Sequence, residues 1–203
     1  TVIGYYGRFI KRFPTLAALA AADEATVMEN WSGLGYYARA RNLHRAAREV
    51  MTRFGGRFPS TVEDIESLPG IGRSTASAIA TFCFGAHAPI LDGNVKRVFA
   101  RVFGIDGFPG TRAVEQRMWA LAHALMPTRD GAVYTQALMD LGATVCTRNR
   151  PRCEACPVAA ADEARKRLAP LMRGQLPAFA VDLGKAQRRA DAVVQAYIHR
   201  RGC

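Results

Sequence analysis

Apolar residues recur at positions i, i+3 and i+4 along most of this chain, which places them on one face of successive α-helices. The pattern predicts helices over residues 1–12, 16–21, 24–31, 38–54, 60–68, 93–102, 113–126 and 133–146, and a helix of small residues that begins after residue 72. No strand is expected before residue 192, where residues 192–199 alternate as one strand would. We therefore predict an all-α fold.

One helix start carries a clear local signal. Ser60 is followed three residues later by Glu63, which is the spacing of a capping box. In a capping box each of the two side chains satisfies a backbone N–H group of the first helical turn. We therefore expect the helix over residues 60–68 to be capped by Ser60.

Two glycines interrupt the helical pattern in the segment that we call the tyrosine segment, residues 31–37. Its sequence continues from Leu34 and Gly35 into two adjacent tyrosines. Such a segment can form a wedge that enters a stack of nucleic-acid bases. The alternative is that both tyrosines are core aromatics at the start of a helix. We expect Tyr36 to be the wedge and Tyr37 to pack in the core.

A tight Leu-Pro-Gly-Ile-Gly turn, the hairpin turn at residues 68–72, precedes the helix of small residues. A Gly-x-Gly turn at the head of a helix leaves backbone N–H groups unpaired, and such groups bind phosphate. An ordinary connection between two helices has the same composition. On the phosphate-binding interpretation the contacting residues are Leu68, Gly70, Ile71, Gly72 and Arg73.

Asp92 stands at the start of a later helix, directly before Gly93. An acid in this position is often an N-cap that accepts hydrogen bonds from helix amides. The four residues before it are apolar (Ala-Pro-Ile-Leu), so we expect a partly desolvated carboxylate whose charge acts strongly. Such a carboxylate can stabilise an oxocarbenium-like sugar cation or attack it, and Asn94 could orient it. The roles of cap and catalyst are compatible.

The five cysteines are Cys83, Cys146, Cys153, Cys156 and Cys203. Cys146, Cys153 and Cys156 have a spacing that suits an iron–sulfur cluster or zinc. A fourth ligand is expected, and Asp162 follows six positions after the last of the three. Between the first two cysteines lie Arg148 and two further arginines, which would present positive charge to a DNA backbone.

The composition of the chain limits the class of molecule that it binds. The 203 residues are 49% hydrophobic, which predicts a globular chain with a real core, and no apolar run approaches the ~20 residues of a membrane span. Lysine and arginine number 28 against 17 acidic residues, for a net charge of +11. This excess favours a polyanionic partner, because each neutralised phosphate releases a counterion. Charge alone does not separate this partner from an ordinary basic surface.

These pieces, in this order, resemble the helix-hairpin-helix DNA glycosylase superfamily, which includes endonuclease III and the MutY-type adenine glycosylases. The resemblance covers roughly residues 1–178. Two runs point to the MutY type, namely residues 33–43 (Gly-Leu-Gly-Tyr-Tyr-Ala-Arg-Ala-Arg-Asn-Leu) and residues 91–97 (Leu-Asp-Gly-Asn-Val-Lys-Arg). The resemblance implies a six-helix domain and a second helical domain with an iron–sulfur loop. We place these at residues 1–90 and 91–168, with a linker and the start of a C-terminal domain at residues 169–203.

Ser74 bears on the reaction that the resemblance implies. Endonuclease III has a lysine here that forms a Schiff base with the sugar, whereas serine cannot form an imine. The resemblance thus implies a monofunctional glycosylase that flips adenine out of the duplex and hydrolyses its glycosidic bond. The implied catalytic residues are Asp92, Asn94 and Ser74, and we also expect Lys96 to contact DNA. The implied substrate is double-stranded DNA with adenine opposite 8-oxoguanine or guanine.

Two departures from the family pattern matter. Thr1 is no initiator methionine, and we expect a fragment that lacks the family's general-acid glutamate, which precedes the residues matched by Thr1, and most of its C-terminal domain. We therefore expect this polypeptide to bind DNA, to excise adenine weakly, and to discriminate poorly between 8-oxoguanine and guanine. The family's cluster also uses four cysteines, so we expect a [4Fe-4S] cluster with Asp162 or an outside ligand in the fourth position. A three-iron form or an empty loop stays possible.

Three alternatives stay open. An endonuclease III-like pyrimidine glycosylase is one, although Ser74 argues against it. A non-catalytic DNA-binding module and a structural protein with a zinc loop are the others. For every DNA-binding alternative we expect a monomer without a membrane partner, in the bacterial cytoplasm at the nucleoid.

Overall fold

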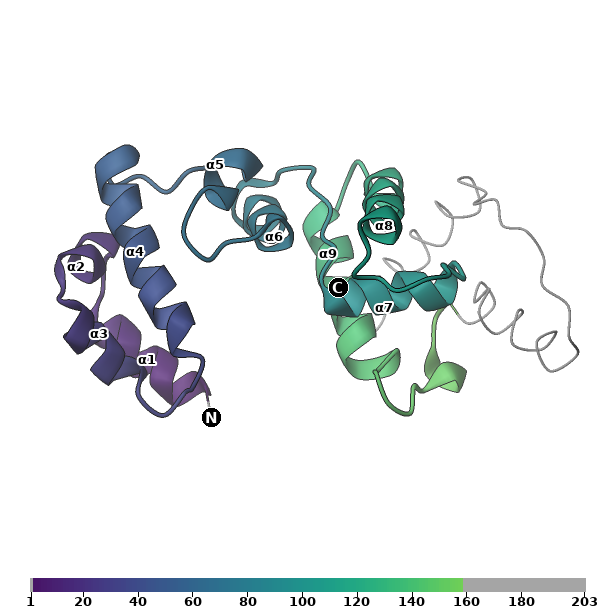
Figure 1. The fold of residues 1–203 in the computed structure, drawn as a ribbon, viewed down its shortest axis with the longest axis horizontal. Helices are drawn as coiled ribbons and strands as arrows, with labels where there is room; N and C mark the ends of the chain where they lie inside the picture. Colours follow the sequence, from purple (N-terminus) through teal and green to yellow (C-terminus); the bar gives the residue numbers. More distant parts are fainter. Residues whose placement is uncertain (1, 159–203) are drawn as a thin grey trace, which may run out of the picture. The chain divides into compact units, whose positions relative to one another are not determined.

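The computed structural model describes residues 2–158, and within this range every regular element is a helix (Figure 1). The predicted all-α class is confirmed for the described residues. The chain divides into two compact units, one ending at Ala76 and the other beginning at Ser77. This division lies within helix α6 (Arg73–Phe84), earlier than the predicted boundary between residues 90 and 91. The expected strand at residues 192–199 lies outside the described residues.

The first unit is built on one long helix. Its elements are α1 (Val2–Arg12), α2 (Leu16–Ala21), α3 (Glu24–Trp31), α4 (Tyr37–Arg53) and α5 (Val62–Glu66). Helices α2 and α3 pack on α4, and α1 packs on α3. Phe13, Leu19, Val27 and Ala47 form a buried cluster between them. Helix α4 can take this central place because its buried positions are mostly alanine, which lets neighbouring helices approach closely.

The helix α3 starts at a charged cap. The Oδ1 atom of Asp23 accepts a hydrogen bond from the backbone N–H of Thr26 at 2.7 Å, and the Thr26 hydroxyl donates to Oδ2 at 2.9 Å. The first of these bonds, with the second in support, lowers the pKa of the exposed Asp23 carboxyl. The ionised form of Asp23 is therefore the one that fixes the start of α3.

The capping box expected at Ser60 is wrong by one residue. Thr61 is the N-cap of α5, and its Oγ1 accepts from the backbone N–H of Asp64 at 3.2 Å. The Thr61 hydroxyl also donates to the Asp64 carboxylate at 2.8 Å. The sequence offers two overlapping capping pairs, Ser60 with Glu63 and Thr61 with Asp64, and the helix begins at the second pair.

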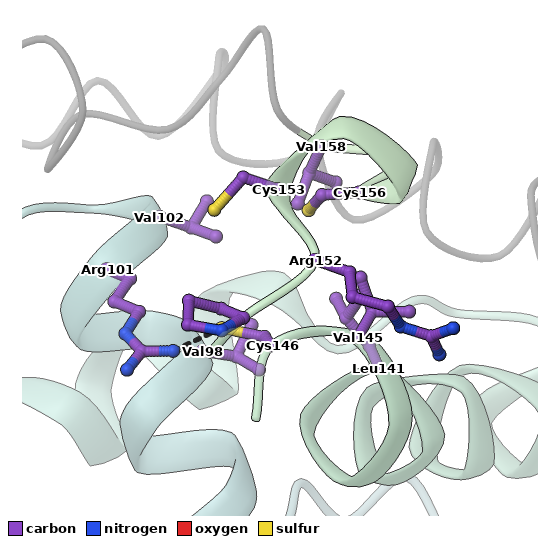
Figure 2. A pocket seen from close by; sticks show the side chains of 11 residues that line it. Val98, Arg101, Val102, Leu141, Val145, Cys146, Arg152, Cys153, Cys156 and Val158 are labelled. Carbon is purple, nitrogen blue, oxygen red and sulfur yellow. Dashed lines mark hydrogen bonds between the residues drawn. The ribbon is translucent and has the colours of Figure 1, made fainter. Parts of the chain in front are cut away.

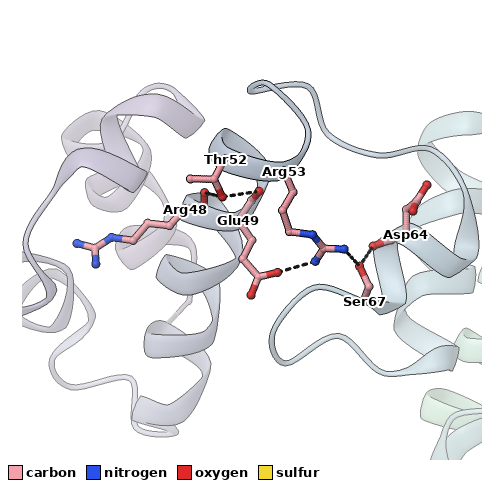
Figure 3. A network of polar contacts seen from close by, with 6 residues as sticks. All are labelled: Arg48, Glu49, Thr52, Arg53, Asp64 and Ser67. Atoms are coloured by element: carbon pink, nitrogen blue, oxygen red, sulfur yellow. Dashed lines mark hydrogen bonds and ion pairs between the residues drawn. The ribbon is translucent and has the colours of Figure 1, made fainter.

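A polar network ties α4 to the segment just before the hairpin turn (Figure 3). Arg53 donates to Glu49 at 2.7 Å on its own helix and to the Ser67 hydroxyl at 3.1 Å. Ser67 in turn donates to the backbone oxygen of Asp64 at 2.7 Å. The start of the hairpin turn is thereby fixed to the end of α4 within the first unit.

The second unit contains α7 (Gly93–Val102), α8 (Arg112–Leu125), α9 (Gly131–Asp140), the π-helix η1 (Leu141–Val145) and the short 3₁₀-helix η2 (Cys153–Ala155). Helix α7 packs against both α9 and η1. The core of the second unit includes the fully buried residues Val95, Phe99, Met118 and Leu125. The single helix expected over residues 133–146 is corrected to α9 and η1. Wide turns of this kind are rare and occur frequently at functional sites.

None of the helices in the described range is both long and apolar enough to cross a membrane.

Candidate nucleic-acid interface and active site

The hairpin turn is held by one buried side chain and one close backbone approach. Leu68 is buried, and the Ile71 N–H donates to its carbonyl oxygen at 3.2 Å. Gly70 has φ +77°, and a Cβ there would lie 2.6 Å from the Cβ of Asn42 on α4. Only glycine combines that backbone conformation with that proximity. Gly72 is exposed with open space around it, so the face of the turn at the head of α6 is accessible.

Two predicted residues lie in the first turn of α6. Arg73 is exposed and Ser74 is half-buried. Both directly follow the hairpin turn, as the sequence requires. The Ser74 hydroxyl is a poor nucleophile toward an aldehyde sugar, which bears on the choice between hydrolysis and Schiff-base chemistry.

The tyrosine segment presents its first tyrosine to solvent. Tyr36 has φ +50° and is 76% exposed, and Gly35 before it has φ +71°. The indole N–H of Trp31 donates to the Gly35 carbonyl at 3.0 Å and so closes the segment. Leu34 is half-buried beside them. The expectation that Tyr37 packs in the core is wrong, because this side chain is 43% exposed.

Asp92 is half-buried and is the N-cap of α7. Its Oδ1 accepts from the Val95 N–H at 2.8 Å, and the Asn94 side-chain amide lies 3.4 Å from its Oδ2. The preceding Ile90 and Leu91 are buried, so the carboxylate stands at the edge of an apolar core. Asp92 is thus a helix cap whose second oxygen has Asn94 as its donor, as the sequence suggested.

Sequence reasoning missed Arg97, which fixes the orientation of Asn94. Its Nη2 donates to Asn94 Oδ1 at 2.7 Å, and this bond turns the amide nitrogen of Asn94 toward Asp92. The same guanidinium donates to the backbone oxygens of Gly142 and Cys146, each at 2.7 Å. These last two acceptors are 45 and 49 residues away and are main-chain atoms, which have no signature in the sequence.

Cys146, Cys153 and Cys156 line one pocket (Figure 2). Arg101, one turn after Arg97 on α7, donates to the Sγ of Cys146 at 3.4 Å, as the dashed line in Figure 2 shows. It also donates to the backbone oxygen of Thr147 at 2.8 Å. A cationic donor therefore lies beside the first sulfur of the pocket.

The fit of this pocket to a metal cofactor is partial. Three sulfur donors face one pocket, which is the donor chemistry of an iron–sulfur site. Within residues 2–158, however, no three His, Cys, Asp or Glu side chains are close enough together to bind a single metal ion. The fourth ligand expected from the sequence, Asp162, lies outside the described residues.

Two predicted DNA contacts are basic side chains of the second unit. The ammonium of Lys96 forms an ion pair with Glu115 at 2.6 Å, so a phosphate would have to compete with that carboxylate. Arg148 is exposed, and its backbone oxygen accepts from Arg101 at 3.3 Å. Arg101 therefore holds both the first cysteine and the basic loop after it.

Comparison with known proteins supplies the family. Residues 1–124 match the model of the HhH-GPD superfamily of base excision DNA repair proteins. The chain belongs to this superfamily. The resemblance that the hairpin turn and the Asp92 segment suggested is confirmed, as is the helix-hairpin-helix glycosylase fold.

Within the HhH-GPD superfamily, the chain is similar in sequence to adenine DNA glycosylases. Human adenine DNA glycosylase is 46% identical over 170 residues, which are 83% of this chain and 31% of the human protein. An adenine DNA glycosylase of Buchnera aphidicola is 41% identical over 158 residues, which are 78% of this chain and 44% of that protein. The matched part of the chain thus spans 31% of the length of one relative and 44% of the length of the other, less than half of either.

Solved structures of the superfamily share the fold. A thermostable thymine-DNA glycosylase superposes with a TM-score of 0.73 at 27% identity, over 81% of this chain and 76% of that one. Endonuclease III in a non-covalent complex with DNA gives a TM-score of 0.68 at 21% identity, over 82% of this chain and 77% of that one.

Proposed function

We propose that the protein is a monofunctional adenine DNA glycosylase, which hydrolyses the glycosidic bond of adenine opposite 8-oxoguanine or guanine. The observation that carries the proposal is the half-buried Asp92 carboxylate at the head of α7, with Val95 and Asn94 as its donors. Its support is that relatives at 46% and 41% identity are adenine DNA glycosylases.

Asp92 acts on the sugar. As the bond to adenine lengthens, positive charge develops on the deoxyribose, and a fixed carboxylate stabilises that charge or attacks the cation. The two donors hold the carboxylate before the substrate arrives, so it does not need to reorient during the reaction. Arg97 keeps the Asn94 amide in the orientation that serves this purpose.

The leaving adenine needs a proton, because a neutral base departs more easily than an anion. The resemblance assigns this proton to a glutamate upstream of the residues matched by Thr1, so activity has to be measured on the full-length protein. Ser74 cannot form an imine, and the product is therefore an abasic site in an uncut strand.

The hairpin turn and the tyrosine segment are assigned to DNA. The exposed backbone at Gly72, with open space around it, suits one phosphate, and the exposed ring of Tyr36 suits the space between stacked bases. Arg73 and Arg148 add exposed positive charge. These contacts carry no sequence information of their own, so mispair recognition depends on extrusion of the base.

The cysteine pocket is assigned a [4Fe-4S] cluster, with Asp162 or an outside ligand on the fourth iron. When bound, the cluster would be held by Cys146, Cys153 and Cys156, would keep the loop around Arg148 in shape, and would supply no group to the hydrolysis. Anaerobic reconstitution followed by counts of iron and sulfide tests this assignment, with absorbance near ~400 nm as the expected signature of the cluster. Bound zinc without sulfide would contradict it.

A single-turnover assay of adenine release from a duplex with one adenine opposite 8-oxoguanine tests the reaction. Asp92→Asn should slow release at least ~100-fold and leave duplex affinity nearly unchanged. Asp130→Asn is the matched control, because Asp130 also stands at a helix N-cap in the same unit but caps no amide with its side chain.

The same assay separates hydrolysis from the alternatives. Borohydride should trap no covalent complex with the sugar, whereas a lyase would be trapped. Unchanged release by Asp92→Asn would refute the assigned mechanism, and binding without any release by the unaltered full-length protein would favour the non-catalytic module.

A further inference from the structure

Tyr36 has a partner that its proposed role as a wedge does not explain. The guanidinium carbon of Arg39 lies 4.8 Å from the centre of the Tyr36 ring. This is within the range of a cation–π interaction. The two residues are three positions apart across the first turn of α4, where Tyr36 is the N-cap and the Arg39 N–H donates to the Tyr36 carbonyl at 2.8 Å.

The ring of Tyr36 needs such a partner because little else restrains it. It is 76% exposed, and an exposed aromatic side chain loses rotamer freedom when it enters a base stack. Its backbone already has the left-handed conformation, at φ +50°. Non-glycine residues adopt this conformation at a cost, and residues that do so are found frequently at functional sites. The side chain is therefore the part of the wedge that remains to be oriented.

The backbone on which Tyr36 stands is itself supported from two sides. The Trp31 indole donates to the Gly35 carbonyl at 3.0 Å. On the other side, the hydroxyl of Tyr5 on α1 occupies the place where a side chain at position 33 would otherwise begin. The segment thus presents Tyr36 from a constrained turn, and Arg39 is the contact that acts on the ring.

We propose that Arg39 is a positioning residue that holds the Tyr36 ring in the orientation that enters the base stack. This rests on the proposed function, in which Tyr36 is the wedge. The planar guanidinium covers one face of the ring and restricts its rotation before DNA is bound, and the other face is left for a nucleobase. Arg39 thereby reduces the entropy that base extrusion has to overcome, and it takes no part in the chemistry at the sugar.

The pair is tested first in the free full-length protein, without any DNA. The side-chain Nε–H resonance of Arg39, assigned by its loss in Arg39→Lys, should shift when Tyr36→Leu removes the ring current. No shift would overturn the proposal, whatever the protein does to DNA.

The role is then tested by a double-mutant cycle on base extrusion. A duplex with 2-aminopurine beside the target adenine reports extrusion as a fluorescence rise in a stopped-flow instrument. Arg39→Gln should slow the rise by about two- to fivefold, which is the size of an exposed cation–π contact. In the Tyr36→Leu background the same change should have no effect, because the ring it acts on is gone.

Two further variants complete the cycle. Arg39→Lys should restore part of the rate, since an ammonium keeps the charge but lacks the planar stack. Arg12→Gln removes an equal charge from another arginine–aromatic pair of the same unit, the one with Phe13, and should leave the rate unchanged.

Each remaining outcome has one meaning. An equal slowing by Arg39→Gln with and without the Tyr36 ring would identify Arg39 as an independent phosphate contact and overturn the proposal. If Tyr36→Leu alone extrudes the base at the normal rate, the wedge assignment in the proposed function fails instead.

Discussion

Gly142 gives the sharpest test of the site geometry. This residue is buried in η1, and a Cβ added to it would lie 2.6 Å from the Cβ of Asn94 and 3.1 Å from its Cα. Carbon atoms in contact normally stay about 3.5–4.0 Å apart, so Gly142→Ala must separate η1 from the first turn of α7 by roughly 1 Å. One extra methyl in a packed core costs about 1–3 kcal/mol.

The same separation strains a shared donor. Arg97 Nη2 bonds to the Gly142 oxygen on one side of the contact and to Asn94 on the other, each at 2.7 Å. A hydrogen bond to a charged group contributes about 1.5–3 kcal/mol, and one of these two should weaken. We therefore expect Gly142→Ala to lower the free energy of unfolding by about 2–4 kcal/mol, since the two effects overlap.

Urea unfolding measures this change, and the adenine-release assay measures its effect on Asp92. Release should slow as well, because Asn94 moves with α7 and loses its alignment with the carboxylate. Gly93→Ala is the control on the same turn, where an added Cβ meets nothing within 4 Å. If Gly142→Ala and Gly93→Ala unfold within about 0.5 kcal/mol of each other, the close approach of η1 and α7 is refuted.

Three further results are expected. Gly70→Ala should destabilise the protein by about 1–3 kcal/mol and weaken duplex binding, because the new side chain meets α4. Gly72→Ala is the control and should unfold almost normally. Equal unfolding curves for the two variants would contradict the turn geometry. Arg101→Leu should lower the affinity of the cysteine pocket for iron by about 10–100-fold. The control Cys83→Ser, at an exposed cysteine, should keep the full affinity. Iron counts after reconstitution measure the difference, and full iron binding by Arg101→Leu would contradict the role of Arg101 in the pocket. The third concerns Asp23, whose carboxyl has a lowered pKa in the folded state, chiefly through the backbone amide that it accepts. Its stabilisation is complete above the unfolded pKa of about 3.9 and disappears as the pH falls through the folded value, so Asp23→Asn should be less stable than the unaltered protein near neutral pH and equally stable in strong acid. Thermal melting across this pH range measures the difference, and a gap that persists in acid would contradict it.

Local patterns were sufficient for most helices and for the residues of the hairpin turn. The apolar periodicity placed α2 and α3, which bury Leu19 and Val27, and α1, which has a partly buried Phe9 but no fully buried residue, because a clear break follows each of the three. It could not detect η1, since a π-turn interrupts the spacing by one residue and leaves the apolar character unchanged. It also could not choose between Ser60 and Thr61, because both begin a sequence with an acid three positions later.

The candidate site was predictable where its contacts are local. Asp92 and Asn94 stand two residues apart, and their proximity follows from the helix start. Arg97 and Arg101 were beyond reach, because their acceptors include main-chain oxygens about 45 residues later in the sequence. The prediction for Tyr37 was wrong for a different reason. An aromatic residue beside a turn packs inward or outward according to its neighbours in space, and the sequence pattern does not identify them.

The π-helix decides where this chain can change its length. In η1 the Cys146 N–H reaches back five residues to the Leu141 oxygen at 2.7 Å, where an α-helix would reach back four. Deleting the exposed Ala143 would turn this bond into a regular α-helical one between the same two residues, so Cys146 would keep its place in the pocket. The same deletion within a regular helix would instead rotate everything after it by about 100°. The π-turn is therefore a point in the second unit where one residue can be removed and the first sulfur ligand retained.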